Sequence, residues 1–215
     1  EHQHLTELLA AGAQAEADEL VAVGSRTYRR LFTAGDRAHQ RQHGRPNIRL
    51  RDEETAKVIN ATMREDITFW AWAVVETLRL TGLRIEELLE LSQLSIRQYQ
   101  RPNGEVIALL VIAPSKTDRE RVIPMSAELL HVIACIIRRL TRDRSTVPLA
   151  TRFDKIERVT SDPQPFLFQR RLGQRNEVLS NGAVNEMLRR TCARVAHQHP
   201  EFAGLHFSPH DFRRL

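Results

Sequence analysis

Residues 66–80 carry apolar side chains around most of a helical circumference, and the rest of the chain must pack in a way that covers them. The pattern consists of Ile67, Phe69, Trp70, Trp72, Val74, Val75, Leu78 and Leu80. A helix that is apolar on nearly every side is stable in water only when other elements bury it. The sequence therefore predicts a central helix surrounded by further helices. Both tryptophans are expected in this core and not on a surface that stacks DNA bases.

The composition is that of a globular protein with one sizeable core, or with one main domain and part of another. The chain has 215 residues, of which 41% are hydrophobic and 27% charged. Its longest apolar run, residues 106–113, is too short to span a bilayer as a helix. Lysine and arginine number 32 against 27 acidic residues, and this net charge of +5 is compatible with nucleic acid as a partner. Cys135 and Cys192 lack metal-site spacing, which indicates a reducing compartment, the cytoplasm.

Residues 1–48 are expected to be the helical tail of an N-terminal DNA-binding unit, followed by a basic linker. Apolar residues between Leu5 and Val23 recur at helical spacing, and Gly24-Ser25 interrupts the pattern. Arginines are then frequent from residue 26 to residue 45. They can follow a DNA phosphate backbone or form the solvated face of a helix, and both interpretations stay open. Pro46-Asn47 marks a boundary, so residues 49–215 are expected to form the main domain.

The main domain is expected to be mainly α-helical with one small three-stranded antiparallel β-sheet. Asp52-Glu53-Glu54 has the composition of a helix start for residues 56–63. After a helix at residues 85–91, the apolar period changes from 3.6 toward 2. A turn at residues 101–104 contains the Asn-Gly pair that hairpins favour, and β-rich segments follow it.

The second hairpin of this sheet is expected to carry Lys116 at its tip, between strands at residues 106–113 and 119–125. A lysine on a hairpin tip has a role only if the tip reaches a site. Ser126 and Ser180 each precede an amphipathic helix, and residues 144–165 have the prolines and the lack of period that are typical of a long loop.

Arg84 is the first candidate functional residue, because it follows a break at Thr81-Gly82 between two buried segments. A permanently charged guanidinium in such a place needs a partner. Glu87 lies three residues on, on the same helical face. The pair can be an internal ion pair that fixes a helix start. Alternatively, Glu87 only steadies the arginine while its remaining donors hold an oxyanion, above all a phosphate.

The last segment, residues 205–215, contains a second strong helix-start signal. Ser208 is placed as N-cap, Pro209 at the first helical position and Asp211 in the first turn. His210 and Arg213 then share one face, where a phosphate meets backbone N–H groups, an imidazole and a guanidinium.

No metal or other cofactor is expected. His206 precedes the predicted helix that holds His210, so the two cannot bind zinc at i,i+4 spacing. His39 and His43 have that spacing but no acidic or cysteine ligand beside them.

These motifs together resemble the catalytic domain of tyrosine recombinases, the phage-integrase family. The resemblance rests on Gly82-Leu83-Arg84 with Glu87, on Lys116, and on His210-Asp211-Phe212-Arg213, in that order, and covers about residues 50–215. It implies a site-specific DNA recombinase that breaks and rejoins double-stranded DNA through a 3′-phosphotyrosyl intermediate, without metal or external energy. It also implies four protomers on two duplexes at a specific recombination site, in the cytoplasm beside a bacterial nucleoid.

The resemblance assigns a role to each candidate residue. Arg84 and Arg213 would stabilise the phosphate in transit, as rigid guanidinium forks do better than lysines. Lys116 would protonate the 5′-oxygen leaving group, His210 would transfer a proton or orient the phosphate, and Glu87 would steady Arg84.

Two departures from the family motif bear on activity. Phe212 and Arg214 stand where the family more often has leucine and histidine. The nucleophilic tyrosine is expected downstream of Arg213, whereas Tyr28 and Tyr99 lie upstream. We therefore expect a fragment that binds DNA without cleaving it.

Two alternatives to a recombinase stay open. One is a type IB topoisomerase-like or telomere-resolving enzyme, and the other is a non-catalytic DNA-binding relative or accessory protein. For a recombinase, the biological task, whether phage integration, transposition of a mobile element or chromosome resolution, is likewise left open by the sequence.

Overall fold

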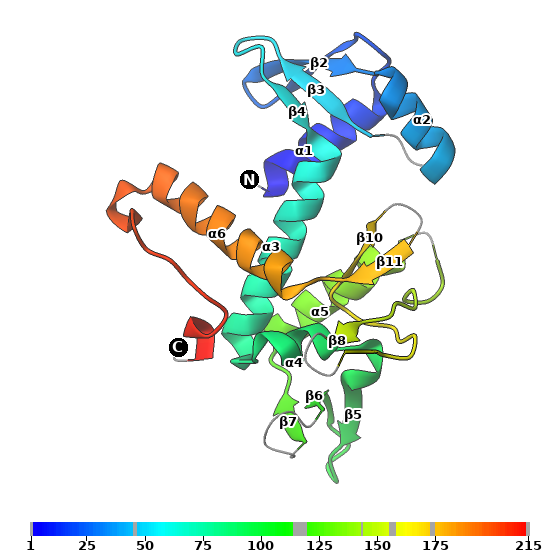
Figure 1. The fold of residues 1–215 in the computed structure, drawn as a ribbon, viewed down its shortest axis with the longest axis vertical. Coiled ribbons are helices and arrows are strands. Elements are labelled where there is room, and N and C mark those ends of the chain that lie inside the picture. The colour runs from blue at the N-terminus through cyan, green and yellow to red at the C-terminus, as the bar shows by residue number, and fades with distance from the viewer. Residues whose placement is uncertain are drawn as a thin grey trace. The chain divides into compact units, whose positions relative to one another are not determined.

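The computed structural model of the chain, drawn in Figure 1, describes residues 2–44, 47–113, 120–142, 144–154, 158–172 and 175–213. By its internal contacts the chain divides into two compact units, residues 1–70 and 71–215. Helix α3 (Ala61–Thr81) contains the boundary between them. Each unit has its own elements and its own buried residues, and the candidate active-site residues belong to the second.

The first unit is a four-stranded antiparallel sheet with helices beside it (Figure 1). Its elements are α1 (His2–Gln14), β1 (Leu20–Val23), β2 (Arg26–Leu31), α2 (Ala34–His43), β3 (Arg49–Asp52), β4 (Val58–Asn60) and the start of α3. The strands pair in chain order, β1-β2-β3-β4. Leu5 and Leu8 of α1 are buried with Val23, Tyr28 and Leu50 of the strands, and this cluster is the core of the unit.

The expectation of one helix from Leu5 to Val23 and a linker after it was wrong. Helix α1 ends at Gln14, and residues 20–23 form β1. The chain reverses at Asp18, whose φ of 65° is left-handed, and again at Gly24, with φ of 61°, where a two-residue turn joins β1 to β2. The arginine-rich residues after it form β2 and α2 instead of a linker.

The helix predicted for residues 56–63 was also wrong. Asp52 ends β3, and its carboxylate accepts hydrogen bonds from the backbone N–H groups of Glu54 and Thr55, both at 2.9 Å. An aspartate uses the same capacity to cap a helix or to close a turn, and here it closes the turn to β4. Helix α3 begins only at Ala61, where the side chain of Asn60 accepts the N–H of Met63.

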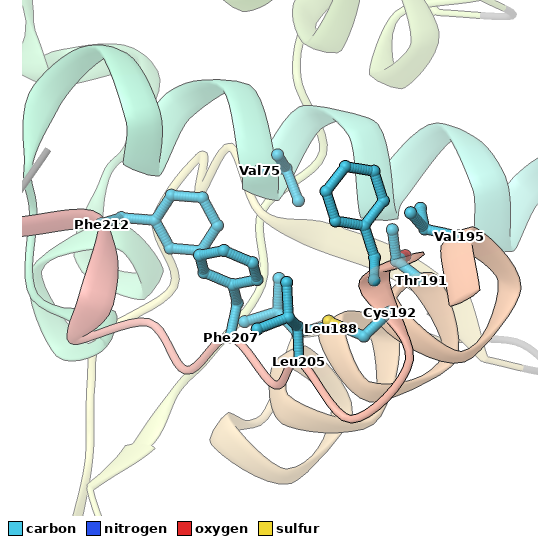
Figure 2. A pocket seen from close by; sticks show the side chains of 9 residues that line it. Val75, Leu188, Thr191, Cys192, Val195, Leu205, Phe207 and Phe212 are labelled. Carbon is cyan, nitrogen blue, oxygen red and sulfur yellow. The ribbon is translucent and has the colours of Figure 1, made fainter. Parts of the chain in front are cut away.

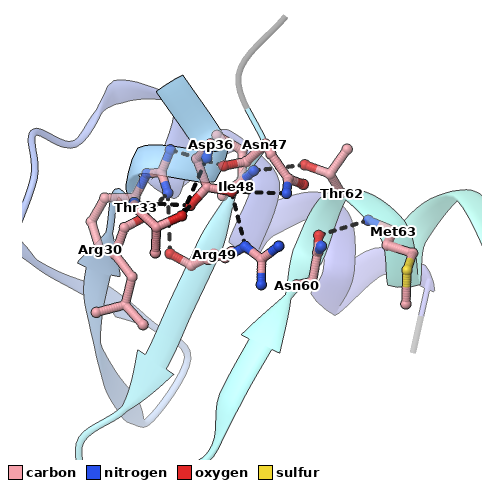
Figure 3. A network of polar contacts seen from close by, with 10 residues as sticks. Arg30, Thr33, Asp36, Asn47, Ile48, Arg49, Asn60, Thr62 and Met63 are labelled. Carbon is pink, nitrogen blue, oxygen red and sulfur yellow. Dashed lines mark hydrogen bonds and ion pairs between the residues drawn. The ribbon is translucent and has the colours of Figure 1, made fainter. Parts of the chain in front are cut away.

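A buried arginine and a buried aspartate tie the first unit together (Figure 3). The Arg30 guanidinium donates to the backbone carbonyls of Gly12, Arg49 and Asn47 at 3.0 to 3.2 Å, so it connects α1, β3 and the segment before β3. Burial lowers the pKa of Arg30 and the nearby Asp36 carboxylate opposes that change. These contacts make Arg30 a structural residue and not a DNA-facing one.

Asp36 caps helix α2 and holds the segment before β3. Its Oδ2 accepts the N–H and the hydroxyl of Thr33, and its Oδ1 accepts from Asn47 and from Nε of Arg49, both at 2.9 Å. Burial alone raises the pKa of this carboxyl group, but the hydrogen bonds outweigh burial and lower it from 3.8 to about 2. The ionised carboxylate therefore stabilises the folded unit.

Substituting Asp36 with asparagine should remove a pH-dependent part of that stability. Because the pKa of Asp36 is lower in the folded than in the unfolded state, its ionised carboxylate stabilises the fold above about pH 4 by on the order of 2 kcal/mol. This stabilisation is lost as the pH falls toward about 2. We expect Asp36→Asn to lower the opening free energy of the β2 and β3 amides at pH 7, with a difference that shrinks below about pH 4. Amide hydrogen exchange measures it. The control is Asp162→Asn, at an exposed site, whose opening free energies should equal those of the parent at every pH. If the stability of Asp36→Asn falls with acid as steeply as that of the parent, this account is contradicted.

The described residues of the second unit form most of the helices and three further antiparallel sheets. Its elements after α3 are α4 (Ile85–Glu90), the 3₁₀ helix η1 (Gln93–Ser95), β5 (Ile96–Gln100), β6 (Val106–Ile112), β7 (Arg121–Pro124), α5 (Ala127–Leu140), β8 (Phe153–Asp154), β9 (Val159–Thr160), β10 (Gln169–Leu172), β11 (Arg175–Val178), α6 (Asn181–Gln198), and the 3₁₀ helices η2 (Pro200–Phe202) and η3 (Asp211–Arg213). Within the described residues, no helix combines the length and the apolar character that a bilayer crossing requires.

The core of this unit lies among α3, α4, α5 and α6. Its fully buried residues include Val74, Leu78, Leu83, Leu88, Leu129, Ile133, Ile136, Leu167, Phe168 and Val184. The capping serines predicted for α5 and α6 are confirmed, because the side chains of Ser126 and Ser180 accept backbone N–H groups of the first turn. Trp70 is buried as expected, whereas Trp72 is only partly buried and its ring lies edge-on to His131.

The fold-class prediction needs a correction in its β content. The predicted sheet is present as β5-β6-β7, with Tyr99 opposite Ile107 and Leu110 opposite Ile123. It is not the only one, because the described residues also form the four-stranded sheet of the first unit and the hairpins β8-β9 and β10-β11. The β8-β9 hairpin falls within residues 144–165, which were expected to be a loop. Its strands have two residues each, too short for any apolar period to show.

Candidate active site

The junction between α3 and α4 fixes the first candidate residue. Gly82 has a left-handed φ of 60°, and its N–H donates to the carbonyl of Leu78 at 2.9 Å, which ends α3. Leu83 is fully buried, and Arg84 stands in extended conformation as the N-cap of α4. The backbone of Arg84 is thus held between a helix end, a buried leucine and a helix start.

Glu87 completes this arrangement from the third position of α4. Its Oε2 accepts the backbone N–H of Arg84 at 2.8 Å, and its Oε1 accepts Nη1 of Arg84 at 3.0 Å. The predicted contact between the two residues is therefore present. The Glu87 side chain is 1% exposed, whereas that of Arg84 is 34% exposed. A buried carboxylate orients a guanidinium that still reaches the surface.

Arg121 is a second guanidinium on the same carboxylate, and it was missed in the sequence. Its Nη2 lies 2.5 Å from Oε2 of Glu87, and its side chain is 40% exposed. Arg121 is the first residue of β7, where a single arginine looks like any solvent-facing strand residue. Only the fold, which brings β7 to α4, reveals the contact.

The segment that carries Arg213 lies against this junction. A Cβ atom added at Gly82 would be 3.9 Å from the Cα of Arg213, so the two backbones lie close together with room for little more than one methyl group between them. Phe212 is buried, its ring centroid is 6.0 Å from that of Phe207, and it anchors the segment. The Arg213 side chain is exposed, as is that of His210. Two arginines that are far apart in the sequence are thereby brought to one region of the second unit.

The local structure around His210 differs in part from the prediction. The described residues form a short 3₁₀ helix, Asp211–Arg213, instead of an α-helix that starts at Pro209. Ser208 and Asp211 do pair as a helix start requires, because Oδ2 of Asp211 accepts the N–H of Ser208 at 2.8 Å and its hydroxyl at 2.7 Å. This pairing places Arg213 after a rigid turn.

Comparison with known protein families shows to which family the chain belongs. Residues 49–215, which include every element from β3 onward, match the family described as Phage integrase family. This chain is a member of the phage integrase family. Searches of curated proteins and of solved structures found no match.

Lys116, the remaining candidate of this integrase-family site, lies outside the residues that the structure describes. The base of its hairpin is described. Ile112, the last residue of β6, pairs with Arg121, the first of β7, and Arg121 contacts Glu87. The hairpin that contains Lys116 therefore starts beside the carboxylate that orients Arg84.

An apolar pocket of about 380 Å³ lies next to the Arg213 segment of this family member (Figure 2). It is lined from α3 by Val75, from α6 by Leu188, Thr191, Cys192 and Val195, and from the following segment by Phe202, Leu205, Phe207 and Phe212. None of these side chains carries a charge, so the pocket is not suited to hold a phosphate. Its walls instead support the segment in which Phe212 precedes Arg213.

The other two acids of α4 serve the integrase domain in a different way. Arg152 donates Nη1 to Glu90 at 2.9 Å and Nη2 to Glu86, and the amide of Asn181 also donates to Glu86. These contacts connect α4 to the segment before β8 and to the start of α6. Among the described residues, no group of three or more His, Cys, Asp or Glu side chains is arranged to hold a metal ion.

Replacing Gly82 with alanine should destabilise the second unit. The left-handed φ costs a residue with a Cβ about 1 to 2 kcal/mol, and the new Cβ would meet Arg213 only at ordinary contact distance, so strain and not a clash sets the effect. Urea unfolding measures the change. The control is Gly182→Ala in α6, which has no left-handed φ and should not destabilise, since alanine is the better helix former. Equal stability of the two variants would exclude backbone strain at Gly82.

Proposed function

We propose that this chain forms part of a site-specific DNA recombinase that breaks and rejoins double-stranded DNA through a 3′-phosphotyrosyl intermediate. The observation that carries the proposal is the close approach of the Arg213 backbone to the α3–α4 junction at Gly82, two residues before Arg84. Membership of the phage integrase family supports this kind of activity. The net charge of +5 favours a polyanionic partner.

In this proposal the two arginines bind the non-bridging oxygens of one phosphodiester. Guanidinium groups match the geometry of a phosphate with paired N–H donors and keep their charge at any physiological pH. Charge on these oxygens grows as the phosphorus gains a fifth ligand, so fixed donors stabilise the transition state more than the ground state. Glu87 keeps Arg84 in the orientation that this role requires.

Proton transfer is assigned to Lys116 and His210. A tyrosine oxygen attacks phosphorus, the bond from phosphorus to the 5′-oxygen breaks, and Lys116 gives that oxygen a proton as it leaves as a 5′-hydroxyl. His210 assists by moving the tyrosine proton or by orienting the phosphate. Rejoining reverses these steps, with the 5′-hydroxyl as nucleophile.

Neither tyrosine of residues 1–215 suits the role of nucleophile. Tyr28 is 1% exposed in the core of the first unit, and Tyr99 lies on β5. We therefore expect residues 1–215 to bind DNA without cleaving it, and a form of the protein extended past Leu215 to be needed for cleavage. As the family resemblance implies, the working assembly would be a homotetramer on two duplexes, in the cytoplasm beside the nucleoid.

A covalent-adduct assay tests the proposal. The extended protein is incubated with a nicked duplex whose site has been selected by binding from random sequence, so that the cleaved fragment diffuses away and the adduct accumulates. We expect an adduct that resists denaturant and is lost after protease digestion, and no adduct with residues 1–215 alone.

The outcomes separate the competing functions. Adduct formation followed by joining of two duplexes supports a recombinase, whereas relaxation of one supercoiled duplex without joining would indicate topoisomerase-like activity. Tight DNA binding by the extended protein with no adduct would instead favour a non-catalytic DNA-binding relative.

A further inference from the structure

We propose that Arg121 is a positioning residue of the phosphate site: it holds Glu87 from β7 and so fixes the carboxylate that orients Arg84. The inference rests on the proposed function, because it concerns how that site is built. It assigns a role to a residue that neither the sequence motifs nor the family match singles out.

The contacts of the Glu87 carboxylate are divided between two arginines. Oε1 accepts Nη1 of Arg84, while Oε2 accepts the Arg84 backbone N–H and Nη2 of Arg121. A carboxylate held on both oxygens cannot rotate, and its fixed Oε1 in turn fixes the direction of the Arg84 guanidinium.

The charges of the cluster also depend on Arg121. Arg84 and Glu87 carry opposite charges, and Arg121 adds a second positive charge beside the same carboxylate. The carboxylate is buried and both guanidinium side chains are more than one-third exposed, so the positive charge faces solvent. A phosphodiester carries a single negative charge and complements this cluster.

Helix α4 also takes part in a contrasting cluster, in which one guanidinium contacts two carboxylates. Arg152 is one guanidinium between two carboxylates, Glu86 and Glu90, and its side chain is only 14% exposed. That arrangement neutralises a buried cation and leaves no positive charge for a ligand. Arg121 therefore differs in both charge balance and exposure from Arg152, a structural arginine that also contacts α4.

Arg121 also couples the sheet to the site. It pairs with Ile112 at the base of the β6–β7 hairpin and contacts Glu87 with its side chain. A shift of that hairpin base would move the carboxylate that orients Arg84. The residue is thus placed to bring the hairpin and Arg84 into register when DNA binds.

The test is a phosphate-by-phosphate binding measurement with residues 1–215 and a duplex selected from random sequence. Each phosphate in turn is replaced by a neutral methylphosphonate. The ratio of the dissociation constants for the substituted and unsubstituted duplexes measures how much the charge of that phosphate contributes to binding. The parent should lose about tenfold or more in affinity at one phosphate, as expected for a charged hydrogen-bonded contact, and Arg84→Ala should remove much of that loss, with the remainder due to Arg213.

In Arg121→Gln, the loss of affinity caused by a methylphosphonate at that same phosphate should be severalfold smaller than in the parent. The losses at all other phosphates should equal those of the parent. Arg121→Lys should restore part of the loss at that same phosphate, because an ammonium group can still hold Oε2. Adding Arg121→Gln to Glu87→Gln should have no further effect, since both act through one carboxylate. Arg152→Gln, the matched control that contacts other carboxylates of α4, should keep the parent's pattern.

Four results would overturn the inference: additive effects of the Arg121 and Glu87 substitutions, an Arg121 effect at a different phosphate, an Arg152→Gln variant that behaves like Arg121→Gln, or an Arg84 effect with no Arg121 effect. The last of these would leave the proposed phosphate site intact. Absence of any Arg84 effect would remove the proposed phosphate site itself. If Arg121→Gln does not fold, as judged by thermal unfolding, the comparison of Arg121→Lys with the parent still decides the matter.

Discussion

Replacing either Arg84 or Arg213 with alanine should reduce the rate of DNA strand cleavage by on the order of a hundredfold or more. Each substitution removes a fixed donor pair from the phosphate in its transition state, while most of the DNA-binding surface remains. Arg84→Lys and Arg213→Lys should retain little of the rate, because an ammonium group cannot reproduce a planar fork of two parallel donors.

Single-turnover cleavage with the extended protein, at saturating DNA, separates this effect from weaker binding. Arg189→Ala is the matched control, since Arg189 is an exposed arginine on α6 that pairs with Glu186 of the same helix. It should change the salt dependence of binding at most slightly and leave the cleavage rate unchanged. Alanine variants at Arg84 and Arg213 with near-parental rates would show that these residues are structural.

Leu83→Ala should lower the free energy of unfolding of the second unit by about 2 to 5 kcal/mol. Leu83 is fully buried between the end of α3 and the start of α4, so truncation leaves a cavity at the place that fixes Arg84. A loss of this size is a large fraction of a domain's net stability, which is about 5 to 15 kcal/mol. The variant should therefore unfold at much lower urea concentration.

The control for this prediction is Leu94→Ala, which removes the same atoms from a leucine that is 58% exposed in η1. That change should remain within about 0.5 kcal/mol of the parent. Urea titrations followed by the partly buried Trp72 report on the second unit. Similar midpoints for the two variants would mean that the α3–α4 junction is not tightly packed.

The features that the sequence predicted well are those in which nearby residues determine the structure. Glu87 and Arg84 are three residues apart at a helix start, so their contact follows from helical geometry. The β5–β6 turn follows from local chemistry, with Gly104 in left-handed conformation and the Arg101 N–H bonded to the Glu105 carbonyl. The apolar circumference of α3 predicted a buried helix because burial is the only stable outcome for it.

The features that were missed depend on residues far apart in the sequence. Strands β1, β3 and β4 have three or four residues, too few for an alternation to be distinguished from a helical period. Asp52 was assigned to a helix cap because capping and turn closure use the same side-chain contact. Arg121 reaches Glu87 only through tertiary structure, and no local pattern marks it. The convergence of Arg84 and Arg213 on one phosphate was expected from the family resemblance and not from spacing, and it stays a prediction.

The most direct test of the site is a structure of residues 1–215 bound to the selected duplex. If Arg84 and Arg213 act together, guanidinium nitrogens of both should lie about 2.7 to 2.9 Å from non-bridging oxygens of one and the same phosphate. Contacts of the two arginines with different phosphates, or a duplex bound on a face that leaves both without DNA, would contradict the account.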